Sequence, residues 1–499
     1  MQPFQADARE TRLYSAEQVR ELDRIAIEEL AIPGIVLMKR AGLAVYEAIS
    51  MLDSSRARLS VLCGRGNNAG DGYIVAGIAL DQGLEVQLLQ LGSSDALSGD
   101  AARARDWALG RGVVAEQFAC DSELRGDVVV DSLLGTGLVG TVRDEFVAAI
   151  DAINRCARSV IAVDVPSGLC ADTGAPLGCA VNANLTVTFI GRKRGLYTGA
   201  GKEHAGQVVY ADLDVNESAF ARVPVRVELL RLGENVSVPQ RRRRDAHKGS
   251  FGHVLVVGGD LGMGGAALMA AEAAMRTGAG LTSVATRAEH ISGFLARRPE
   301  LMVRGVGNAK ELSPLIERAT VVVVGPGLGR AAFGEQLLKA ALDSRKAMVL
   351  DADALNILAD RGWSLPPPSV ITPHPGEASR LLGWNTQAVV ADRFAAIEAL
   401  IEKFRCAVVL KGAGTLVGDP DSRIGVCEAG NPGMASGGMG DVLSGVVGGL
   451  LAQGLSAIDA ARVGVCVHAC AADAVAAQAG ERGLLATDLI ADVRRILNT

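Results

Sequence analysis

Short apolar runs rich in valine, isoleucine and leucine recur along the chain, and most are followed by a stretch with helical spacing. Strands that alternate with helices form parallel sheets joined by right-handed crossovers. Runs that are apolar at nearly every position indicate strands buried on both faces, so helices should cover both sides of each sheet. We therefore predict an α/β fold. The predicted strands are 58–63, 85–91, 128–132, 159–165 and 185–190, then 254–258, 321–324, 347–351, 369–372 and 407–411.

Two helices are predicted ahead of the first strand. The segment 15–30 begins with Ser15 and Gln18, the spacing of a capping box, and continues with apolar residues at helical intervals. A second helix is predicted over 34–52.

The length of the chain, 499 residues, exceeds what one hydrophobic core usually holds. The alternation of strands and helices fades between about 215 and 248, where two prolines and the arginine run 241–244 occur. We predict two domains, a Rossmann-like α/β/α sandwich at 1–222 and a second α/β/α sandwich at 228–499. The arginine run is compatible with phosphate binding, but a solvated linker is the simpler interpretation.

The overall charge and the cysteines exclude several classes of protein. A formal net charge of −6 gives no general attraction to nucleic acid or to acidic membranes, so we expect small-molecule partners bound at local sites. Nine cysteines without a CxxC pair fit a reduced compartment, and the N-terminus does not resemble a secretory signal. The apolar region 442–479 is interrupted by charged residues, which indicates buried helices rather than a membrane span. We expect a cytoplasmic protein.

Glycine and polar residues follow the predicted strands of the second half. Ligands of open α/β sheets bind beyond the carboxyl ends of the strands, so these segments should meet at one edge. The strongest of them is 436–441, Ser-Gly-Gly-Met-Gly-Asp, at the predicted start of a helix. Unpaired backbone N–H groups and the helix dipole make such a turn an anion-binding site, here assigned to Gly438, Met439 and Gly440.

Each candidate side chain in this half has an alternative role. Asp441 could be a catalytic base or a plain N-terminal cap, and the convergence of several glycine-rich loops favours catalysis. His374 could contact substrate or only bond its own loop, and Lys411 could hold a nucleotide or lie solvated at the rim. Asp351 and Asp353 could bind Mg²⁺ through water or cap the next helix.

Strand ends of the first half also carry polar residues. The segment 64–72, Gly-Arg-Gly-Asn-Asn-Ala-Gly-Asp-Gly, has the character of a phosphate-binding turn without being a P-loop. Asp131 and Asp164 follow two further strands, and Ser167 lies just beyond. Oxygen ligands suit a hard cation, and a cage with little negative charge suits a monovalent one.

The second half resembles the ribokinase-like superfamily and, within it, the ADP- or ATP-dependent NAD(P)H-hydrate dehydratases. The resemblance implies that Asp441 activates the C6 hydroxyl of a hydrated nicotinamide dinucleotide to attack the terminal phosphate of ADP, with Mg²⁺ neutralising phosphate charge. It places the substrate on Ala266, Gly327, His374 and Asp441, and ADP on Lys411, Gly412, Ala413, Gly414, Thr415 and Gly440. The segments that carry the resemblance are 248–252, 325–329, 351–356, 372–377, 411–415 and 431–445.

The first half is similar to the NAD(P)H-hydrate epimerases through 64–68, Asp131 with 135–138, and 164–168. The resemblance makes Asp164 the candidate acid/base that interconverts the R and S hydrates. It places K⁺ on Asn68, Asp131 and Ser167. It assigns the dinucleotide to Asn67, Asn68, Ala69, Gly70, Asp71, Gly135, Thr136, Gly137, Leu138, Val139, Gly140, Thr141 and Asp164.

Two features depart from the epimerase pattern. Ala69 stands where a glycine is usual, and Lys39-Arg40 replaces a more usual acid and amide. The favoured interpretation is a bifunctional repair enzyme for NADH and NADPH hydrates, expected by resemblance to be a homo-oligomer. A vitamin kinase is the alternative for the second domain, and a non-catalytic scaffold is the alternative for the first.

Overall fold

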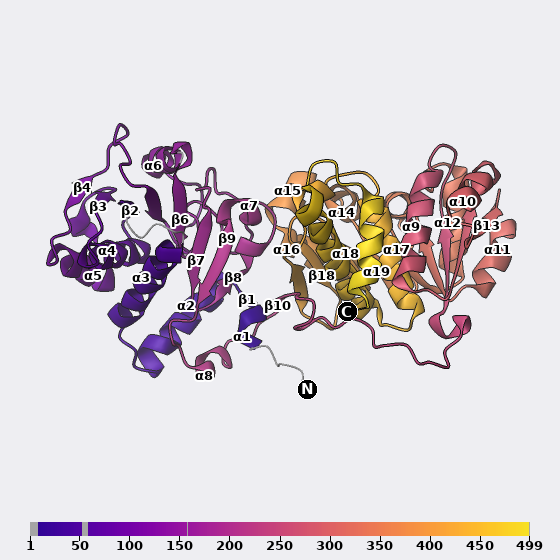
Figure 1. Cartoon of the computed structure of the whole chain (residues 1–499), viewed down its shortest axis with the longest axis horizontal. Helices are drawn as coiled ribbons and strands as arrows, with labels where there is room; N and C mark the ends of the chain where they lie inside the picture. Colours follow the sequence, from indigo (N-terminus) through magenta and orange to yellow (C-terminus); the bar gives the residue numbers. More distant parts are fainter. Residues whose placement is uncertain (1–7, 52–57, 157, 499) are drawn as a thin grey trace. The chain divides into compact units, whose positions relative to one another are not determined.

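The computed structural model describes residues 8–51, 58–156 and 158–498 of the chain (Figure 1). Contacts divide the chain into two compact units. The N-terminal unit is Arg12–Val227, and the C-terminal unit is Glu228–Thr499, with which the short helix α1 (Ala8–Thr11) is grouped.

The N-terminal unit is built on a parallel sheet in the order β4-β3-β2-β5-β6-β7-β9. A short parallel pair that is not part of this sheet, β1 (Arg12–Tyr14) with β8 (Arg192–Lys193), joins residues far apart in the sequence. The strands of the sheet are β2 (Leu59–Cys63), β3 (Val86–Gln90), β4 (Ala115–Gln117), β5 (Val128–Ser132), β6 (Ser159–Val163), β7 (Leu185–Phe189) and β9 (Gln207–Ala211).

Helices cover both faces of this sheet. Side chains alternate across a strand, so Val61 and Val130 pack on one face with α3, α4 and α5, while Leu62 and Val129 pack on the other with α6. Figure 1 shows α3, α4 and α5 close together in the N-terminal unit. The helices are α2 (Ala16–Arg24), α3 (Gly34–Met51), α4 (Asn67–Asp81), α5 (Gly99–Leu109), α6 (Asp144–Arg155), α7 (Gly201–Ala205) and α8 (Glu217–Phe220).

The C-terminal unit has a longer sheet. Its strands β13-β12-β11-β14-β15-β16-β17 are parallel, and β18 and β19 continue it as an antiparallel hairpin beside β17. The strands are β10 (Val227–Leu229), β11 (His253–Val257), β12 (Leu281–Thr286), β13 (Met302–Gly305), β14 (Val321–Val324), β15 (Ala347–Leu350), β16 (Ser369–Ile371), β17 (Ala407–Leu410), β18 (Thr415–Gly418) and β19 (Ile424–Cys427).

One face of the C-terminal sheet is covered by α9 (Gly264–Thr277), α17 (Met439–Ala452), α18 (Ala457–Ala479) and α19 (Leu489–Ile496), which lie together in Figure 1. Helices α9 and α17 are in close contact, because a side chain at Gly445 would lie 2.1 Å from the backbone oxygen of Ala270. The other helices are α10 (Ile291–Arg297), α11 (Ala309–Arg318), α12 (Ala332–Asp343), α13 (Asp353–Arg361), α14 (Pro375–Leu382), α15 (Thr386–Ala391) and α16 (Arg393–Phe404).

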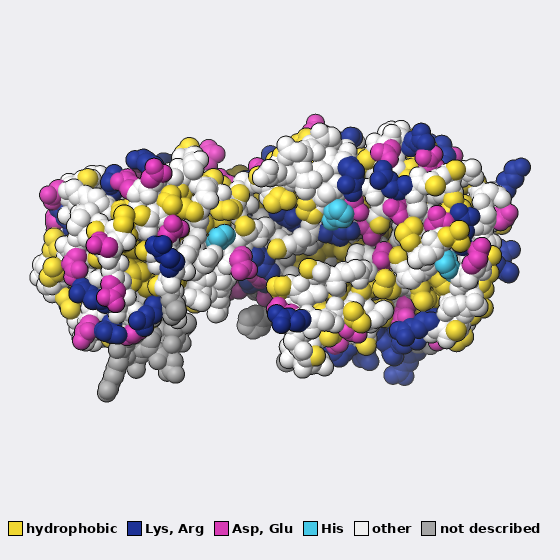
Figure 2. Space-filling view, turned by 90° about the horizontal axis from the view of Figure 1, so that it is seen from above, with side chains coloured by type: hydrophobic (Ala, Val, Ile, Leu, Met, Phe, Trp, Pro, Cys, Tyr) yellow, Lys and Arg dark blue, Asp and Glu magenta, His cyan; other side chains and the backbone are white. Residues whose placement is uncertain are grey.

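Helix α18 is the one helix among the described residues that is long and apolar enough to cross a membrane by length and composition alone. It packs on α17 and α19, and 61% of its most apolar window is buried. It is therefore a core helix of this unit. Acidic and basic side chains are interspersed on the face of the molecule seen in Figure 2.

The predicted α/β fold is confirmed, with differences at the ends of elements. The capping box of Ser15 and Gln18 is present, but α2 ends at Arg24 and a π-helical turn continues to Glu29. The strand predicted at 159–165 ends at Val163, because the backbone at Asp164 turns into the left-handed region. Residue 52, the predicted end of α3, lies outside the described residues. The limits of the domains, 1–222 and 228–499, stay a prediction.

Candidate active sites

The parallel strands of the C-terminal unit bring the predicted loops to one edge. Strands β11, β14, β15, β16 and β17 are neighbours in the sheet, so the segments that follow them meet at their carboxyl ends. These segments are 258–266, 325–329, 351–353, 372–377 and 411–415.

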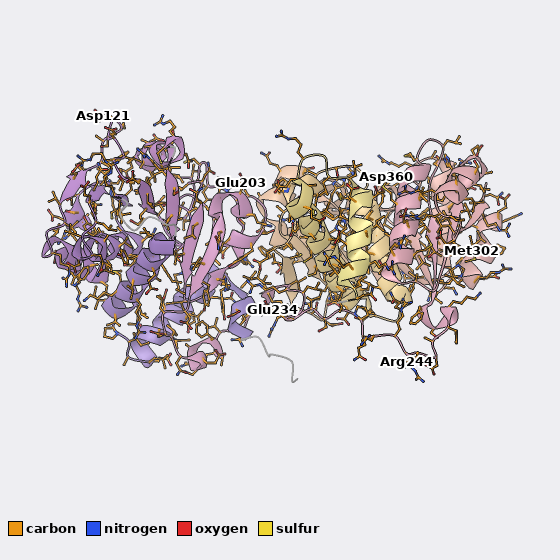
Figure 3. The ribbon with its side chains drawn as sticks, in the orientation of Figure 1. Asp121, Glu203, Glu234, Arg244, Met302 and Asp360 are labelled. Carbon is orange, nitrogen blue, oxygen red and sulfur yellow. The ribbon has the colours of Figure 1, made fainter. Side chains whose placement is uncertain are left out.

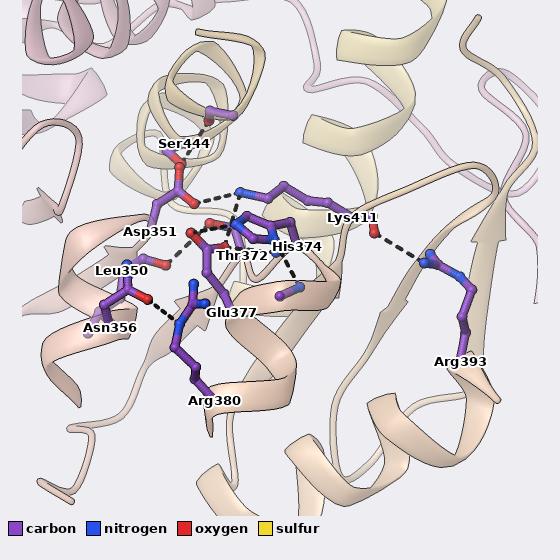
Figure 4. Close-up of polar contacts among 12 residues, drawn as sticks. Leu350, Asp351, Asn356, Thr372, His374, Glu377, Arg380, Arg393, Lys411 and Ser444 are labelled. Carbon is purple, nitrogen blue, oxygen red and sulfur yellow. Dashed lines mark hydrogen bonds and ion pairs between the residues drawn. The ribbon is translucent and has the colours of Figure 1, made fainter. Parts of the chain in front are cut away.

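A buried ion pair lies at the centre of this edge. Lys411 Nζ is 2.7 Å from Asp351 Oδ1 and 3.8 Å from a carboxylate oxygen of Glu377, and Ser444 Oγ donates to Asp351 Oδ2 at 2.8 Å (Figure 4). Burial opposes the charge of Asp351, but Lys411 and the hydrogen bonds outweigh it and hold the pKa of Asp351 below its usual range. Only 20% of the Lys411 side chain is exposed, so the alternative of a solvated rim lysine is wrong.

Helix α17 begins at the same place. Gly438 is its N-cap with φ +93° and makes no side-chain capping bond, so the first N–H groups of the helix keep their capacity for an anion. A side chain at Gly440 would lie 3.1 Å from Lys411 Nζ and 3.4 Å from Asp351 Oδ2. The turn of Gly438, Met439 and Gly440 therefore lies beside the buried ion pair.

Asp441 is in the first turn of α17 and partly buried. Burial and the neighbouring carboxylate of Asp351 raise its pKa to about 7, while Lys411 opposes the shift. The N-cap of the helix is Gly438 and not Asp441. A carboxyl group with this pKa can take up or release a proton near neutral pH.

A buried arginine donates hydrogen bonds to the backbone of the turn between β17 and β18. Arg393 is 3% exposed and donates to the backbone oxygens of Leu410, Lys411 and Gly414. A side chain at Gly412, where φ is +140°, would lie 2.7 Å from the Arg393 guanidinium. This arginine fixes the shape of the turn Lys411, Gly412, Ala413, Gly414 and Thr415.

His374 forms a hydrogen bond within its own loop, as the alternative interpretation of this residue predicts. Its Nδ1 accepts from the N–H of Gly376 at 3.0 Å, which makes it the N-cap of α14, and Glu377 completes a capping box. About half of the side chain stays exposed. Burial and the charge of Lys411 lower the pKa of His374 below its usual value.

Ala266 and Gly327 lie next to each other. A side chain at Gly327, where φ is +57°, would be 3.2 Å from the Cβ of Ala266. Asp353, the first residue of α13, accepts from the N–H of Gly329 at 2.9 Å. Its carboxylate therefore holds the loop after β14.

The N-terminal unit contains a cavity of about 760 Å³ at the carboxyl edge of its sheet. Most residues of the predicted dinucleotide site line it, but Ala69, Gly70 and Gly140 are not among its lining residues. Ala69, in the first turn of α4, is fully buried in the core, and a side chain at Gly70 would meet Met38 at 2.6 Å. The predicted residues that line it are Asn67, Asn68, Asp71, Gly135, Thr136, Gly137, Leu138, Val139, Thr141 and Asp164.

Asp164 lies in this cavity and pairs with Lys193, which is 1% exposed. Asp164 also accepts from the N–H of Phe189 at 3.1 Å, and its φ of +66° places it in the left-handed region. A non-glycine residue held in this conformation marks a strained position. The strain and the ion pair aim the carboxylate into the cavity.

Asp100 also lines this cavity, as do Asp23 and Asp71, whose pKa values are raised. Burial raises the pKa of Asp23 to about 6, with Asp164 adding to the shift and Lys193 opposing it. Burial also raises the pKa of Asp71 well above its usual range, with Asp164 and Asp23 adding to the shift. These acids can carry protons at neutral pH, which suits proton exchange.

The predicted K⁺ ligands lie together beside this cavity. Ser167 donates to Asp131 through its N–H at 2.8 Å and its hydroxyl at 2.6 Å, and Asp131 is fully buried. Asn68 Nδ2 donates to the oxygen of Leu134 at 3.1 Å, while its buried Oδ1 has no hydrogen-bond partner. A buried acceptor without a donor fits a cation.

The comparisons with known proteins match both halves. A family model described as NAD(P)H-hydrate dehydratase matches 254–495, and one described as YjeF-related protein N-terminus matches 34–195. The bifunctional NAD(P)H-hydrate repair enzyme Nnr of Coxiella burnetii is 48% identical, covering 98% of this chain and 100% of that protein. This chain belongs to the bifunctional NAD(P)H-hydrate repair enzymes. The Escherichia coli enzyme of the same name is 42% identical, covering 97% of this chain and 94% of that protein.

Solved structures are similar to the C-terminal unit of this repair enzyme. The ADP/ATP-dependent NAD(P)H-hydrate dehydratase of Bacillus subtilis, co-crystallised with ATP and Mg²⁺, is 28% identical with a TM-score of 0.49, covering 52% of this chain and 94% of that chain. A ribokinase-like superfamily protein of Enterococcus faecalis is 32% identical with a TM-score of 0.49, covering 52% and 92%. The predicted family is confirmed for both halves.

The two departures from the epimerase pattern lie away from the cavity of the repair enzyme. Lys39 lies over the ring of Trp107, 5.3 Å from its centre, and Arg40 donates to the oxygen of Leu213. Ala69 packs in the core, as described above. None of these three side chains lines the cavity.

Several residues that shape the sites were missed in the sequence. Lys193 and Arg393 follow no glycine-rich motif. Asp23 lies in α2, far in the sequence from the strand ends that carry the predicted site residues. Asp473 in α18 accepts from the N–H of Gly430 and from Asn431 Nδ2, both at 2.8 Å. Asp473 is a charged residue in an alanine-rich helix, whereas Asp23, Lys193 and Arg393 stand beside other charged residues and have no such sequence signal.

Replacing Asp473 by alanine removes both bonds that hold the start of the 430–441 loop. We expect the dehydratase kcat to fall about tenfold. Loss of hydrogen bonds that position the loop should raise the activation free energy by about 1.4 kcal/mol, which corresponds to a tenfold lower rate. Asp473→Asn keeps one acceptor oxygen and should recover part of the loss. Steady-state kinetics at saturating ADP measure both, and an unchanged kcat in the alanine variant contradicts the assignment.

Proposed function

We propose that the chain repairs hydrated NADH and NADPH in two steps divided between its units. Residues 1–222 epimerise the R and S forms at ring carbon 6, and residues 228–499 dehydrate the S form while ADP becomes AMP and phosphate. Membership of the bifunctional repair enzymes supports both activities. The observation that carries the dehydratase is Asp441, with a pKa of about 7, at an uncapped helix start beside a buried lysine.

The arrangement suits transfer of a phosphoryl group to the substrate. Asp441 takes the proton of the C6 hydroxyl, and the oxygen bonds to the terminal phosphorus of ADP as the bond to AMP breaks. The N–H groups of the turn from Gly438 to Gly440 and the cation of Lys411 stabilise the charge on the transferred group. Phosphate then leaves C6 as the adjacent ring carbon loses a proton, which restores NAD(P)H.

The nucleotide is assigned to the turn from Lys411 to Thr415 and to Gly440. Arg393 holds this turn through hydrogen bonds within the protein, which would reduce the cost of ordering it when the nucleotide binds. No group of three His, Cys, Asp or Glu side chains that could hold a metal occurs within the described ranges. Mg²⁺ would therefore be held mainly by the phosphates of the nucleotide, where it neutralises their charge.

Replacing Asp441 by asparagine should lower the dehydratase kcat about 10²- to 10⁴-fold and leave ADP binding nearly unchanged, because only the proton acceptor is lost. The wild-type kcat should rise with pH up to about 7 and then level off, since the base must be unprotonated. Recovery of NADH absorbance from hydrated NADH and ADP measures the rate.

Glu377 is the matched control for this experiment, because its pKa is also raised to about 7, mainly by burial. Glu377→Gln should keep the rise in kcat near pH 7. If that rise disappears in Glu377→Gln, or if turnover persists in Asp441→Asn, Asp441 is not the base. Phosphorylation of a vitamin in place of recovery of NADH would favour a kinase.

The epimerase is supported by the proton carriers in the N-terminal cavity. Epimerisation at C6 needs groups that donate and accept protons as the hydroxyl-bearing carbon is inverted. Asp164 is the candidate acid/base, and Lys193 compensates its charge and fixes its position. Asn67, Asp71, the loop from Gly135 to Thr141 and the start of α4 are assigned to the dinucleotide, with its pyrophosphate at the helix N-terminus.

Replacing Asp164 by asparagine should reduce the rate of R-to-S conversion by about 10²-fold or more, because the group that exchanges the proton is lost. The dehydratase rate on pure S substrate should not change. Proton NMR of the two hydrates follows the conversion. If the rate is unchanged, the N-terminal unit is a scaffold rather than an epimerase.

We also propose that K⁺ binds to Asn68, Asp131 and Ser167. The support is the buried Oδ1 of Asn68, which lacks a partner, near the buried carboxylate of Asp131. A monovalent cation there would anchor the start of α4 and the loop after β5. We further propose that the enzyme works in the cytoplasm on small molecules, without nucleic acid or membrane, as a homo-oligomer; its nine cysteines are free.

Exchanging K⁺ for choline should lower the unfolding midpoint of the N-terminal unit and slow epimerisation, since a ligand that binds only the folded state stabilises it. In Asp131→Asn the midpoint should no longer depend on K⁺. Differential scanning calorimetry measures the midpoint. A wild-type midpoint that is the same in both salts contradicts the assignment.

A further inference from the structure

The C-terminal unit contains a second cavity that neither proposed activity uses. Its volume is about 940 Å³, and it is lined by residues of the linker 238–242, the ends of α9 and α17, and α19. Helices α9 and α17 both begin at the carboxyl edge of the sheet and end at this cavity, which is lined by Thr277, the last residue of α9, and by Gln453, which directly follows α17. A helix of this length spans roughly 20 Å, so the cavity is separate from the site around Asp441.

The charges around this cavity are all positive. Arg241, Arg242, Arg276 and Arg494 line it, and no aspartate or glutamate does. Arg241, Arg276 and Arg494 form no ion pair with any residue that the structure describes. Cations gathered without compensating carboxylates produce a local field that attracts an anion, even though the chain as a whole is acidic.

One wall of the cavity is fixed without a ligand. The guanidinium of Arg242 lies 3.7 Å from the ring centre of Phe251 and donates to the oxygen of Gly278 and to Gln453 Oε1. The Gln453 amide donates in turn to the oxygen of Thr277 at 3.1 Å. The oxygens of Thr277 and Gly278 at the end of α9, and of Gly449 in the last turn of α17, thus accept bonds from Arg242 and Gln453 rather than from the other three arginines.

We propose that this cavity binds a phosphorylated small molecule of nucleotide size that carries at least two phosphate groups. Guanidinium groups bind phosphate oxygens through paired hydrogen bonds, and three of them match a charge of two or more. The volume lies within the range of about 300 to 1,000 Å³ that small-molecule sites occupy. Val238, Pro239, Met275 and Leu497 add an apolar wall for a base or other ring.

Calorimetric titration of the full chain with ADP tests the proposal. The wild type should bind ADP at two classes of site, and the triple variant Arg241→Ala, Arg276→Ala, Arg494→Ala should bind at least tenfold more weakly at one class. Lys411→Ala should weaken the other class, which belongs to the proposed dehydratase. Each variant should weaken ADP binding at only one class of site. The triple variant therefore tests the cavity, and Lys411→Ala tests the nucleotide site of the proposed function. Identical ADP titrations of the wild type and the triple variant overturn the cavity site.

Titration with NADH distinguishes a dinucleotide from a nucleoside diphosphate as the ligand. If one of the two ligands binds to the cavity at least tenfold more tightly than the other, and the triple variant loses this difference, that ligand represents the class of molecule that the cavity binds. An RNA oligonucleotide that binds the three arginines more tightly than both ligands overturns the proposal of a small molecule.

A matched control removes the same charge elsewhere in the unit, through Arg244→Ala, Arg304→Ala and Arg318→Ala. Arg244 points away from the ribbon at the edge of this unit (Figure 3), and none of the three lines the cavity. In this control variant the ADP dissociation constants of both classes of site should stay within twofold of the wild-type values. An equal loss in this control shows a general effect of charge and overturns the site. If the triple cavity variant unfolds, Arg494→Gln alone should weaken the same class at least threefold.

Discussion

The common direction of the central strands is the constraint on which both sites depend. Parallel strands align their carboxyl ends, and every crossover then delivers a loop to the same edge of the sheet. Asp351 and Lys411 are 60 residues apart in the chain. They meet because β15 and β17 flank β16 in parallel. The same geometry brings Asp131 and Ser167 together after β5 and β6.

The two units share one electrostatic arrangement although their folds differ in detail. Each site contains a buried lysine that pairs closely with one carboxylate, Lys411 with Asp351 and Lys193 with Asp164. Each site also contains more carboxyl groups than one lysine can neutralise. Burial and the neighbouring carboxylates therefore raise the pKa values of Asp441 and Asp23. In this way the paired carboxylate of the C-terminal site stays charged while its neighbour Asp441 can exchange a proton.

Much of the fold and of both sites could be predicted because their signals are local. Apolar runs marked the strands, and glycine-rich turns marked the helix starts that are predicted to bind anions. Residues that act through long-range contacts gave no such signal: Arg393 is recognisable only when its bonds to the turn after β17 are seen. Ala69 and Gly70 belong to a binding motif in the sequence, but the helix turns them into the core. Residues that follow one another in a loop share the cavity, whereas successive residues of a helix point in different directions.

The close contact between α9 and α17 has a mechanical consequence. Small residues let the two backbones approach, since Gly445 and Gly449 lie against the backbone oxygens of Ala270 and Ala274. Flexible side chains that could absorb a shift are missing at these two points of contact. We therefore expect the two helices to move as one unit, so that a displacement along their axes at one end reaches the other. Backbone packing thus connects the turn from Gly438 to Gly440 with the far ends of both helices.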